Sequence, residues 1–216
     1  MGTPPLAEGF EAAMAEQRTR ARQAWKGSGE ESIGVIYKKL VQDGTRVEFT
    51  GYDSCAGSSR ITHIIKNGEL TPTAAAGDEV ELITPATPFY GESGGQSGDA
   101  GTISGRDFQI SIAETAKPLP ELIVHKGTVM KGQLALGDEV QLAVDVQLRG
   151  ATANNHTATH ILQAVLQKHL GKHVKQAGSY VTPDRLRFDF THCEAQPKDE
   201  LKNIEPEVNL RIRENS

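Results

Sequence analysis

Residues 46–148 are divided into short segments by regularly spaced turn signals, and this pattern constrains the fold more than any other feature of the sequence. The signals are glycine-containing dipeptides, which favour tight turns between strands. They fall at Asn67-Gly68, Gly77-Asp78, Gly105-Arg106, Lys131-Gly132 and Gly137-Asp138. Strands are predicted over residues 47–52, 60–66, 79–84, 108–114, 122–129 and 139–146. Many short strands at this spacing predict a small β-barrel.

The string G-D-E-V occurs twice in this region, beginning at Gly77 and again at Gly137. Each copy opens a predicted strand. Shared turn chemistry and a weak internal repeat both explain the recurrence, and neither indicates catalysis.

A pair of histidines, His156 and His160, lies in a segment with helical periodicity. Residues four apart stand one turn above each other, so both rings would project from one face of a helix. The opposite face is apolar and is expected to pack on the core. It consists of Ile161, Leu162, Val165, Leu166 and Leu170. Asn154 or Asn155 is expected to cap the first turn, and Gly171 to end the helix.

The histidine spacing alone leaves the chemistry open. Two imidazoles one turn apart suit a pair of metal ligands, but the polar edge of a packed helix explains the spacing at least as well. A zinc-protease site is disfavoured, because Thr157 stands where that chemistry needs a glutamate. His169 and His173 repeat the spacing, yet Gly171 interrupts the helix between them, so they need not share a face.

Two strands, over residues 174–181 and 186–190, are predicted to follow the helix, with Pro183 in the turn between them. The second strand alternates apolar and charged side chains, which places them on opposite faces. The apolar face holds Leu186, Phe188 and Phe190, and the charged face holds Arg187 and Asp189. A helix packed on this hairpin would bring Gln176 and Ser179 into one cleft with the two histidines.

Residues 91–101 form a glycine-rich segment of unassigned purpose. It lacks the Lys and Ser/Thr ending of a phosphate-binding P-loop, and it carries no dinucleotide fingerprint. Glycines let a backbone approach a ligand or a neighbouring element closely. A binding loop and a purely structural loop are both compatible with this composition.

Both ends of the chain are predicted to be helical. Apolar residues recur at near-helical intervals before Gly27-Ser28-Gly29 and again from Ile33 to Leu40. The first run contains Phe10, Met14, Ala21 and Trp25. Near the other end the spaced residues are Leu201, Ile204, Val208 and Ile212, and Pro206 is expected to kink or restart that helix.

Charge and cysteine content limit the function classes. The formal net charge of -5 and a pI near 5.8 argue against a broadly basic nucleic-acid coat. The region from residue 151 to 192 is locally basic, which suits either a few RNA phosphates or a solvated charged face. Its basic residues are Lys168, Lys172, Lys175, Arg185 and Arg187. Two unpaired cysteines, no signal-peptide core and no apolar run of membrane-spanning length predict a cytoplasmic protein without membrane contact.

Taken together, these motifs resemble the editing domain of the alanyl-tRNA synthetases, which is shared with free-standing alanyl-tRNA editing proteins. The resemblance rests on ordered segments and covers essentially the whole chain. They are F-T-G-Y-D at 49–53, F-Y-G-E-S-G-G-Q-S-G-D at 89–99, the histidine helix, Q-A-G-S at 176–179 and L-R-F-D-F at 186–190. It implies an α+β chain in three parts. These are a helical connector (1–45), a β-barrel (46–149) and the first part of an editing domain built as a helix on an antiparallel sheet (150–216).

The same resemblance implies the chemistry. Zinc would sit on His156 and His160 and on a later C-x-x-x-H motif, for which Cys193 lies too early, so we expect only half of the metal site within these residues. Thr159 and Gln176 would sort the amino acid or orient the attacking water. The residues expected to contact substrate or RNA are Gly94, Gly95, Gln96, Asp99, Lys172, Lys175 and Arg187.

The activity implied is hydrolysis of seryl or glycyl esters wrongly attached to the tRNA for alanine. The parent would be an alanine ligase that uses ATP and Mg, which this fragment would not bind. Its partners would be the acceptor end of that tRNA and the remainder of the synthetase chain. We expect the isolated fragment to be inactive. The alternative is a non-catalytic module that positions RNA or another domain.

Overall fold

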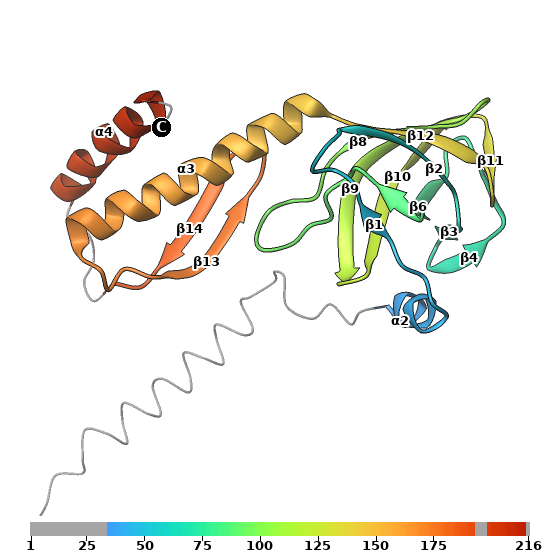
Figure 1. Ribbon diagram of the computed structural model, residues 1–216, viewed down its shortest axis with the longest axis horizontal. Helices are drawn as coiled ribbons and strands as arrows, with labels where there is room; N and C mark the ends of the chain where they lie inside the picture. Colours follow the sequence, from blue (N-terminus) through green and yellow to red (C-terminus); the bar gives the residue numbers. More distant parts are fainter. Residues whose placement is uncertain (1–33, 193–197, 215–216) are drawn as a thin grey trace, which may run out of the picture. The chain divides into compact units, whose positions relative to one another are not determined.

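The computed structural model describes residues 34–192 and 198–214 of the chain, which divides into two units between Val35 and Ile36. The predictions for residues 1–33 and for Cys193 lie outside the described residues. The unit from Ile36 onward contains an eight-stranded antiparallel sheet, a long helix and a β-hairpin (Figure 1). Its elements, in chain order and with α2 starting one residue earlier, are α2 Val35–Gln42, β1 Glu48–Phe49, β2 Ala56–Arg60, β3 His63–Lys66, β4 Glu69–Thr71, β5 Thr73–Ala75, β6 Glu79–Ile83, β7 Ala86–Thr87, β8 Gly101–Ser104, β9 Gln109–Leu119, β10 Leu122–Lys131, β11 Gln133–Ala135, β12 Glu139–Val144, α3 Val146–Leu170, β13 Gln176–Val181, β14 Leu186–Phe190 and α4 Lys198–Glu214.

Eight of the strands form one antiparallel sheet, in the order β2-β12-β8-β9-β10-β6-β3-β4. The predicted α+β class is therefore observed, but the predicted closed barrel is not. Among the described strands, β2 and β4 are the two edges and do not pair with each other. Both edge strands are short and carry exposed polar residues such as Arg60 and Glu69, which is how sheet edges remain unpaired in water.

Alternation of buried and exposed residues places the core on one face of this sheet. In β12, Val140, Leu142 and Val144 are buried while the residues between them are exposed. They join a cluster with Phe89, Ile103, Ile110 and Ile112, among others. Each buried aliphatic side chain of this kind contributes about 1.5–3 kcal/mol relative to an exposed one. A second cluster forms where α2 packs through Leu40 on Ile65, Ile83, Leu122 and Val124.

The repeated G-D-E-V string marks two equivalent turns. Gly77 and Gly137 both have a positive φ, and the aspartate after each accepts a hydrogen bond from a backbone N–H three residues before it. The short strands that precede the two turns, β5 and β11, pair with each other in antiparallel register. The prediction of shared turn chemistry is therefore confirmed.

Helix α3 begins earlier than the sequence predicted. Its N-cap is Asp145, whose carboxylate accepts hydrogen bonds from the backbone N–H groups of Gln147 (2.9 Å) and Leu148 (3.0 Å). The predicted cap at Asn154 or Asn155 is wrong, because those residues lie well inside the helix. The helix continues through residue 150, where we placed a domain boundary, and ends at Gly171 as predicted.

The last part of the chain packs around the apolar face of α3. Val165 and Leu166 are buried against Val174 and Ile204, and the predicted stripe of Ile161, Leu162 and Leu170 packs beside them. The hairpin β13–β14 lies along one side of α3 and α4 along another (Figure 1). Phe188 and Phe190 stack with ring centroids 6.1 Å apart and face the same cluster. Pro206 lies within α4.

Within the described ranges, no helix is both long enough and apolar enough to cross a lipid bilayer.

Candidate functional site

The two predicted histidines stand side by side on α3. The ring centroids of His156 and His160 are 5.0 Å apart, and the ring planes are inclined at 45°. Both side chains are exposed, while the opposite face of the helix packs on the core. The sequence-predicted geometry of one helical face carrying two accessible imidazoles is therefore present.

The glycine-rich loop reaches the first of these rings. The side-chain oxygen Oε1 of Gln96 lies 2.8 Å from Nδ1 of His156. The two residues are 60 positions apart in sequence. A contact of this kind depends on tertiary structure, so the sequence could not specify it.

Backbone pairing fixes the loop on the outer edge of β13. Gln96 forms a parallel bridge with Val181, whose N–H donates to the carbonyl of Gly95 at 2.7 Å. The N–H of Ser97 in turn donates to the carbonyl of Val181 at 2.9 Å. Gly95 has φ +80°, and a Cβ there would collide with the carbonyl oxygen of Ser179. Glycine at this position is therefore required both by conformation and by close packing.

Gln176 lies at the start of β13 and is exposed. Its Nε2 donates to the hydroxyl oxygen of Ser179 at 3.0 Å. Ser179 in turn faces Gly95, since a Cβ built at that glycine would lie 2.9 Å from its hydroxyl oxygen. A chain of direct contacts thus runs from Gln176 through Ser179 and the glycine-rich loop to His156.

Thr159, the other predicted catalytic residue, is buried on α3. Its hydroxyl donates to the carbonyl of Asn155 at 2.8 Å, which leaves only the oxygen lone pairs for another partner. Asn155 itself donates from Nδ2 to the carbonyls of Thr182 (2.8 Å) and Pro183 (3.1 Å). The residue predicted as a possible helix cap therefore fastens α3 to the hairpin turn.

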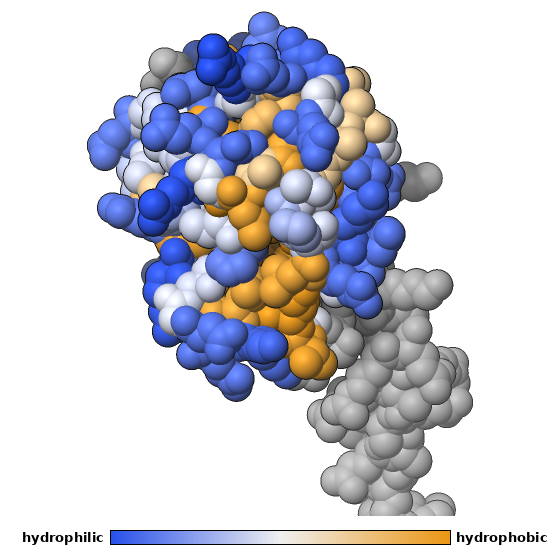
Figure 2. Space-filling model, turned by 90° about the vertical axis from the view of Figure 1, so that its right-hand side faces the viewer, coloured by the Kyte–Doolittle hydropathy of each residue, from blue (hydrophilic) through white to orange (hydrophobic). Residues whose placement is uncertain are grey.

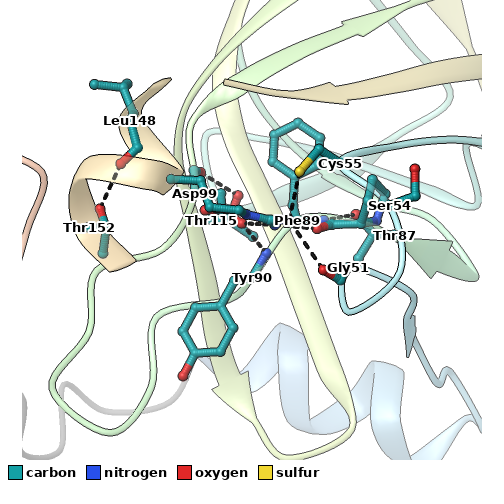
Figure 3. Close-up of polar contacts among 12 residues, drawn as sticks. Gly51, Ser54, Cys55, Thr87, Phe89, Tyr90, Asp99, Thr115, Leu148 and Thr152 are labelled. Atoms are coloured by element: carbon teal, nitrogen blue, oxygen red, sulfur yellow. Dashed lines mark hydrogen bonds and ion pairs between the residues drawn. The ribbon is translucent and has the colours of Figure 1, made fainter. Parts of the chain in front are cut away.

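Asp99 is buried at the other end of the glycine-rich loop, with 7% of its surface exposed. Its carboxylate pairs with the guanidinium of Arg149. The carboxylate also accepts the N–H of Tyr90 at 2.6 Å, and the backbone carbonyl of Asp99 accepts the hydroxyl of Thr115 (Figure 3). We predicted that Asp99 contacts substrate or RNA. The structure places its side chain among these internal partners.

Arg149 is a residue that the sequence analysis did not single out. From the first turn of α3 it also donates to the carbonyls of Pro88 (2.5 Å) and Gly51 (3.3 Å), which come from two separate loops. Burial tends to lower the pKa of Arg149, but the hydrogen bond and the charge of Asp99 outweigh burial and raise it. The only signal in the sequence is that Arg149 and His156 are about two helical turns apart and so share a face.

The predicted RNA contacts lie around the hairpin. Lys172 and Lys175 are exposed, and neither has an ion-pair partner among the described residues. Arg187 is also exposed, but its Nε lies 3.1 Å from Oδ2 of Asp189, which partly offsets its charge. Gly94 is exposed beside the loop tip, with φ +61° and no atom near its Cβ position. These positions are open to a ligand.

The other histidines of α3 and the hairpin form separate contacts. His169 pairs with Glu207 of α4 at 2.8 Å, whereas His173 lies 2.9 Å from a ring nitrogen of His192. The hydrogen bonds from Lys168 and His169 hold the pKa of Glu207 below its ordinary value. His173 lies beyond the end of α3 at Leu170, so His169 and His173 have different partners.

The described residues fit half of a metal site. Across residues 34–192 and 198–214 there is no group of three or more His, Cys, Asp or Glu side chains able to hold an ion. The pair His156 and His160 supplies two nitrogen donors of the type that zinc takes. Gln96 contacts only Nδ1 of His156, so this contact does not occupy the other ring nitrogen, Nε2.

A surface pocket lies elsewhere on the described part of the chain. Residues of α2, β4 and the loops near them line it, including Ile36, Leu40, Arg46, Leu70 and Pro85. None of the predicted site residues borders it.

Figure 2 shows apolar side chains gathered in a strip on one side of the molecule, between hydrophilic margins. The chemistry-bearing residues are thus on an open face rather than in this pocket.

Comparison with known proteins identifies the class. The family model described as tRNA synthetases class II (A) matches residues 6–148, and the chain belongs to this family of class II tRNA synthetases. Its relatives include alanine–tRNA ligases. It is 49% identical over 208 residues to that of Rhizorhabdus wittichii, 46% over 209 residues to that of an Anaeromyxobacter species, and 49% over 206 residues to that of Nitratidesulfovibrio vulgaris.

These alignments cover 95–97% of the chain but only 23% of each relative's length. Because the alignments leave out only 7 to 10 of the 216 residues, most of the histidine helix and of the hairpin lies within the aligned region, although outside the match to the family model.

Proposed function

We propose that the chain is the segment of an alanine–tRNA ligase that leads from the aminoacylation part into the editing module. Residues 1–45 would be the connector, 46–149 the β domain and 150–216 the first part of the editing domain. The 46–49% identity to alanine–tRNA ligases supports the parent activity, which is the ATP- and Mg-dependent attachment of alanine to its tRNA. ATP and Mg would bind to another part of that enzyme.

The observation that carries the editing proposal is the grouping of His156 and His160 with Gln96 beside a hairpin bearing Gln176. The ring centroids of His156 and His160 are 5.0 Å apart and both rings are exposed, which suits two ligands of one ion. A C-x-x-x-H motif would complete the set, as the resemblance to editing domains implies. Zinc bound there would orient the substrate's amino group, polarise the ester carbonyl or lower the pKa of the attacking water.

The chain's own residues would bind and sort the mischarged amino acid. Thr159 has lone pairs left to accept a hydrogen bond from the substrate's amino group or from water, because its proton is held by Asn155. Gln176 is exposed and offers an amide carbonyl beyond the bond that its Nε2 makes to Ser179. Hydrolysis of the ester by an aligned water would release serine or glycine from the tRNA for alanine.

A hydrolytic site of this kind answers a physical limit on selection by binding. A pocket built for a small amino acid rejects a similar one by only about 1–3 kcal/mol, so a second, hydrolytic step supplies the missing fidelity. The unpaired cations of Lys172 and Lys175, with Arg187 nearby in sequence, would hold the phosphates of the acceptor end. Gly94 and Gly95 would border its path. The enzyme would work in the cytoplasm.

A non-catalytic module that positions RNA or a neighbouring domain is the second candidate. The observation in its favour is that the described residues hold no metal-binding group of three or more side chains. Under this alternative the histidines are a polar helix edge.

The test is deacylation of seryl-tRNA for alanine by the full-length ligase. His156→Ala is expected to abolish deacylation and zinc retention while leaving aminoacylation intact. The matched control is His169→Ala, which removes a histidine of the same helix that is paired with Glu207 instead. Equal deacylation by both variants would favour the non-catalytic module.

A further inference from the structure

We infer that Gln96 is a positioning residue for His156: its side-chain carbonyl holds the imidazole in the tautomer protonated at Nδ1, so that Nε2 is the nitrogen presented to a metal. The inference rests on the proposed function, because it takes the histidine pair to be a metal site. It assigns Gln96 to the histidine instead of to the RNA or the substrate.

The atoms in contact determine the tautomer. An amide oxygen only accepts hydrogen bonds, so the 2.8 Å contact between Oε1 of Gln96 and Nδ1 of His156 is a hydrogen bond when Nδ1 carries the proton, and it favours that tautomer. In a neutral ring the lone pair then resides on Nε2. Metal-binding histidines commonly donate their other ring N–H to such an outer partner, which fixes both the tautomer and the ring orientation.

Gln96 is held firmly enough to perform this task. Its backbone lies against Val181 of β13, and a hydrogen bond stands on each side of it. The N–H of Val181 donates to the carbonyl of Gly95 (2.7 Å), and the N–H of Ser97 donates to the carbonyl of Val181 (2.9 Å). A loop residue between two such bonds has little freedom to withdraw its side chain. The carbonyl is therefore presented to the ring from a fixed backbone.

The same loop is attached to α3 at a second point. Asp99, three residues after Gln96, pairs with Arg149, and Arg149 and His156 lie on one face of the helix about two turns apart. The loop thus contacts α3 through an internal ion pair at one place and through a solvent-exposed histidine at another. The Asp99–Arg149 ion pair is part-buried, and attachment of the loop to α3 explains it. The contact of Gln96 with His156 is exposed and adds little stability, so a role in orienting the ring explains it better.

The tautomer is measured on the 216-residue chain without metal, from the ring nitrogen chemical shifts of His156 in ¹⁵N-histidine-labelled protein. The His156 signals are assigned by their loss in His156→Gln. The wild-type ring is expected to be protonated at Nδ1, and Gln96→Met, which keeps the length but removes the acceptor, is expected to shift the ring towards the Nε2-protonated form. Protection of the Val181 amide from hydrogen exchange verifies that the loop still docks.

Zinc affinity is measured on the full-length ligase by competition with a chelator. Gln96→Met is expected to weaken it by about 10–100-fold, the usual effect of removing an outer partner. Gln96→Glu keeps an acceptor oxygen and is expected to retain wild-type affinity. An unchanged tautomer in Gln96→Met, or equal losses of affinity in the Met and Glu variants, would overturn the inference.

These readouts separate the inference from the proposed function. If editing is absent, His156→Ala leaves deacylation unchanged, whereas the tautomer shift in the metal-free chain still reports on Gln96. If Gln96 instead contacts RNA, Gln96→Met raises the KM for mischarged tRNA and leaves both the tautomer and zinc affinity unaltered.

Discussion

The carboxylate of Asp99 and the guanidinium of Arg149 form a part-buried ion pair that joins the glycine-rich loop to the first turn of α3. Arg149 also donates to the carbonyls of Pro88 and Gly51. Asp99 also accepts the N–H of Tyr90 (Figure 3), so the ion pair and these bonds together connect four segments. The ion pair therefore anchors α3 at its N-terminal turn. A change in the direction of the helix at that turn would displace His156 and His160.

Asp99→Ala is expected to destabilise the chain by about 3 kcal/mol, because it leaves the largely buried charge of Arg149 without its partner. Urea denaturation measures the loss. The matched control is Asp189→Ala, which breaks the exposed pair with Arg187 and is expected to cost less than about 1 kcal/mol. Similar losses in both variants would contradict the anchoring role of the Asp99–Arg149 pair.

His125 predicts a specific dependence of stability on pH. It is fully buried, with Nδ1 3.0 Å from the carbonyl of Leu82 and Nε2 2.8 Å from the hydroxyl of Thr87. Burial lowers the pKa of His125 to about 4, against an opposing effect of the bond to Leu82. Because the unfolded chain binds the proton more readily, the stability from this residue is complete above about pH 6.5 and is lost as the pH falls towards 4.

From this pKa difference, unfolding at pH 5 is expected to require about 2 kcal/mol less than at pH 7. The free energy of unfolding at the two pH values, measured in urea, tests this. His125→Gln is expected to remove most of the difference, even though it lowers stability at both pH values. His63→Gln serves as the comparison, since burial lowers the pKa of His63 in the same direction but that ring is only partly buried. A pH difference that persists in His125→Gln would assign it to other groups.

Local patterns specified the parts of this fold that depend on neighbouring residues. The bounds of β14, the apolar stripe on α3 and the paired turns at Gly77 and Gly137 all follow from side-chain period and turn chemistry. The start of α3 was missed because Asp145 caps it within a segment that also reads as the end of a strand. A local sequence pattern cannot distinguish the two when Val144 and Val146 suit either structure.

The candidate site was predictable only in part, for a related reason. The histidine pair is a spacing on one helix, so periodicity revealed it. The contact of Gln96 with His156 and that of Asp99 with Arg149 join residues 60 and 50 positions apart, and only the folded sheet brings them together. A barrel would likewise need its two edge strands, β2 and β4, to pair with each other. Local sequence cannot predict such pairing between distant strands, and in the structure these two short strands stay unpaired with each other.

Gly95 and Gly94 provide a matched pair of substitutions in the glycine-rich loop. Both have a positive φ, so an alanine at either is expected to cost about 1 kcal/mol of backbone strain. Gly95→Ala also drives a methyl group into the carbonyl of Ser179, whereas Gly94→Ala meets no atom. Gly95→Ala alone is expected to release the loop from β13. Hydrogen exchange at the amide of Val181, which donates to the carbonyl of Gly95, measures this release. Equal exchange in both variants would show that backbone strain, and not the contact with Ser179, determines the need for glycine at position 95.

The 216-residue chain by itself is expected to show little or no hydrolysis of seryl-tRNA for alanine, because its described residues offer the two imidazoles of His156 and His160 and no group of three or more ligands. Catalytic zinc sites normally use three protein ligands. A longer chain that continues through a C-x-x-x-H motif is expected to deacylate and to retain zinc by elemental analysis, and His156→Ala in that longer chain is expected to lose both properties. Alanyl-tRNA, tested beside seryl-tRNA, controls for unselective ester hydrolysis. Robust deacylation by the 216-residue chain would mean that two imidazoles with Thr159 and Gln176 suffice, and that the additional ligands are not needed for the chemistry.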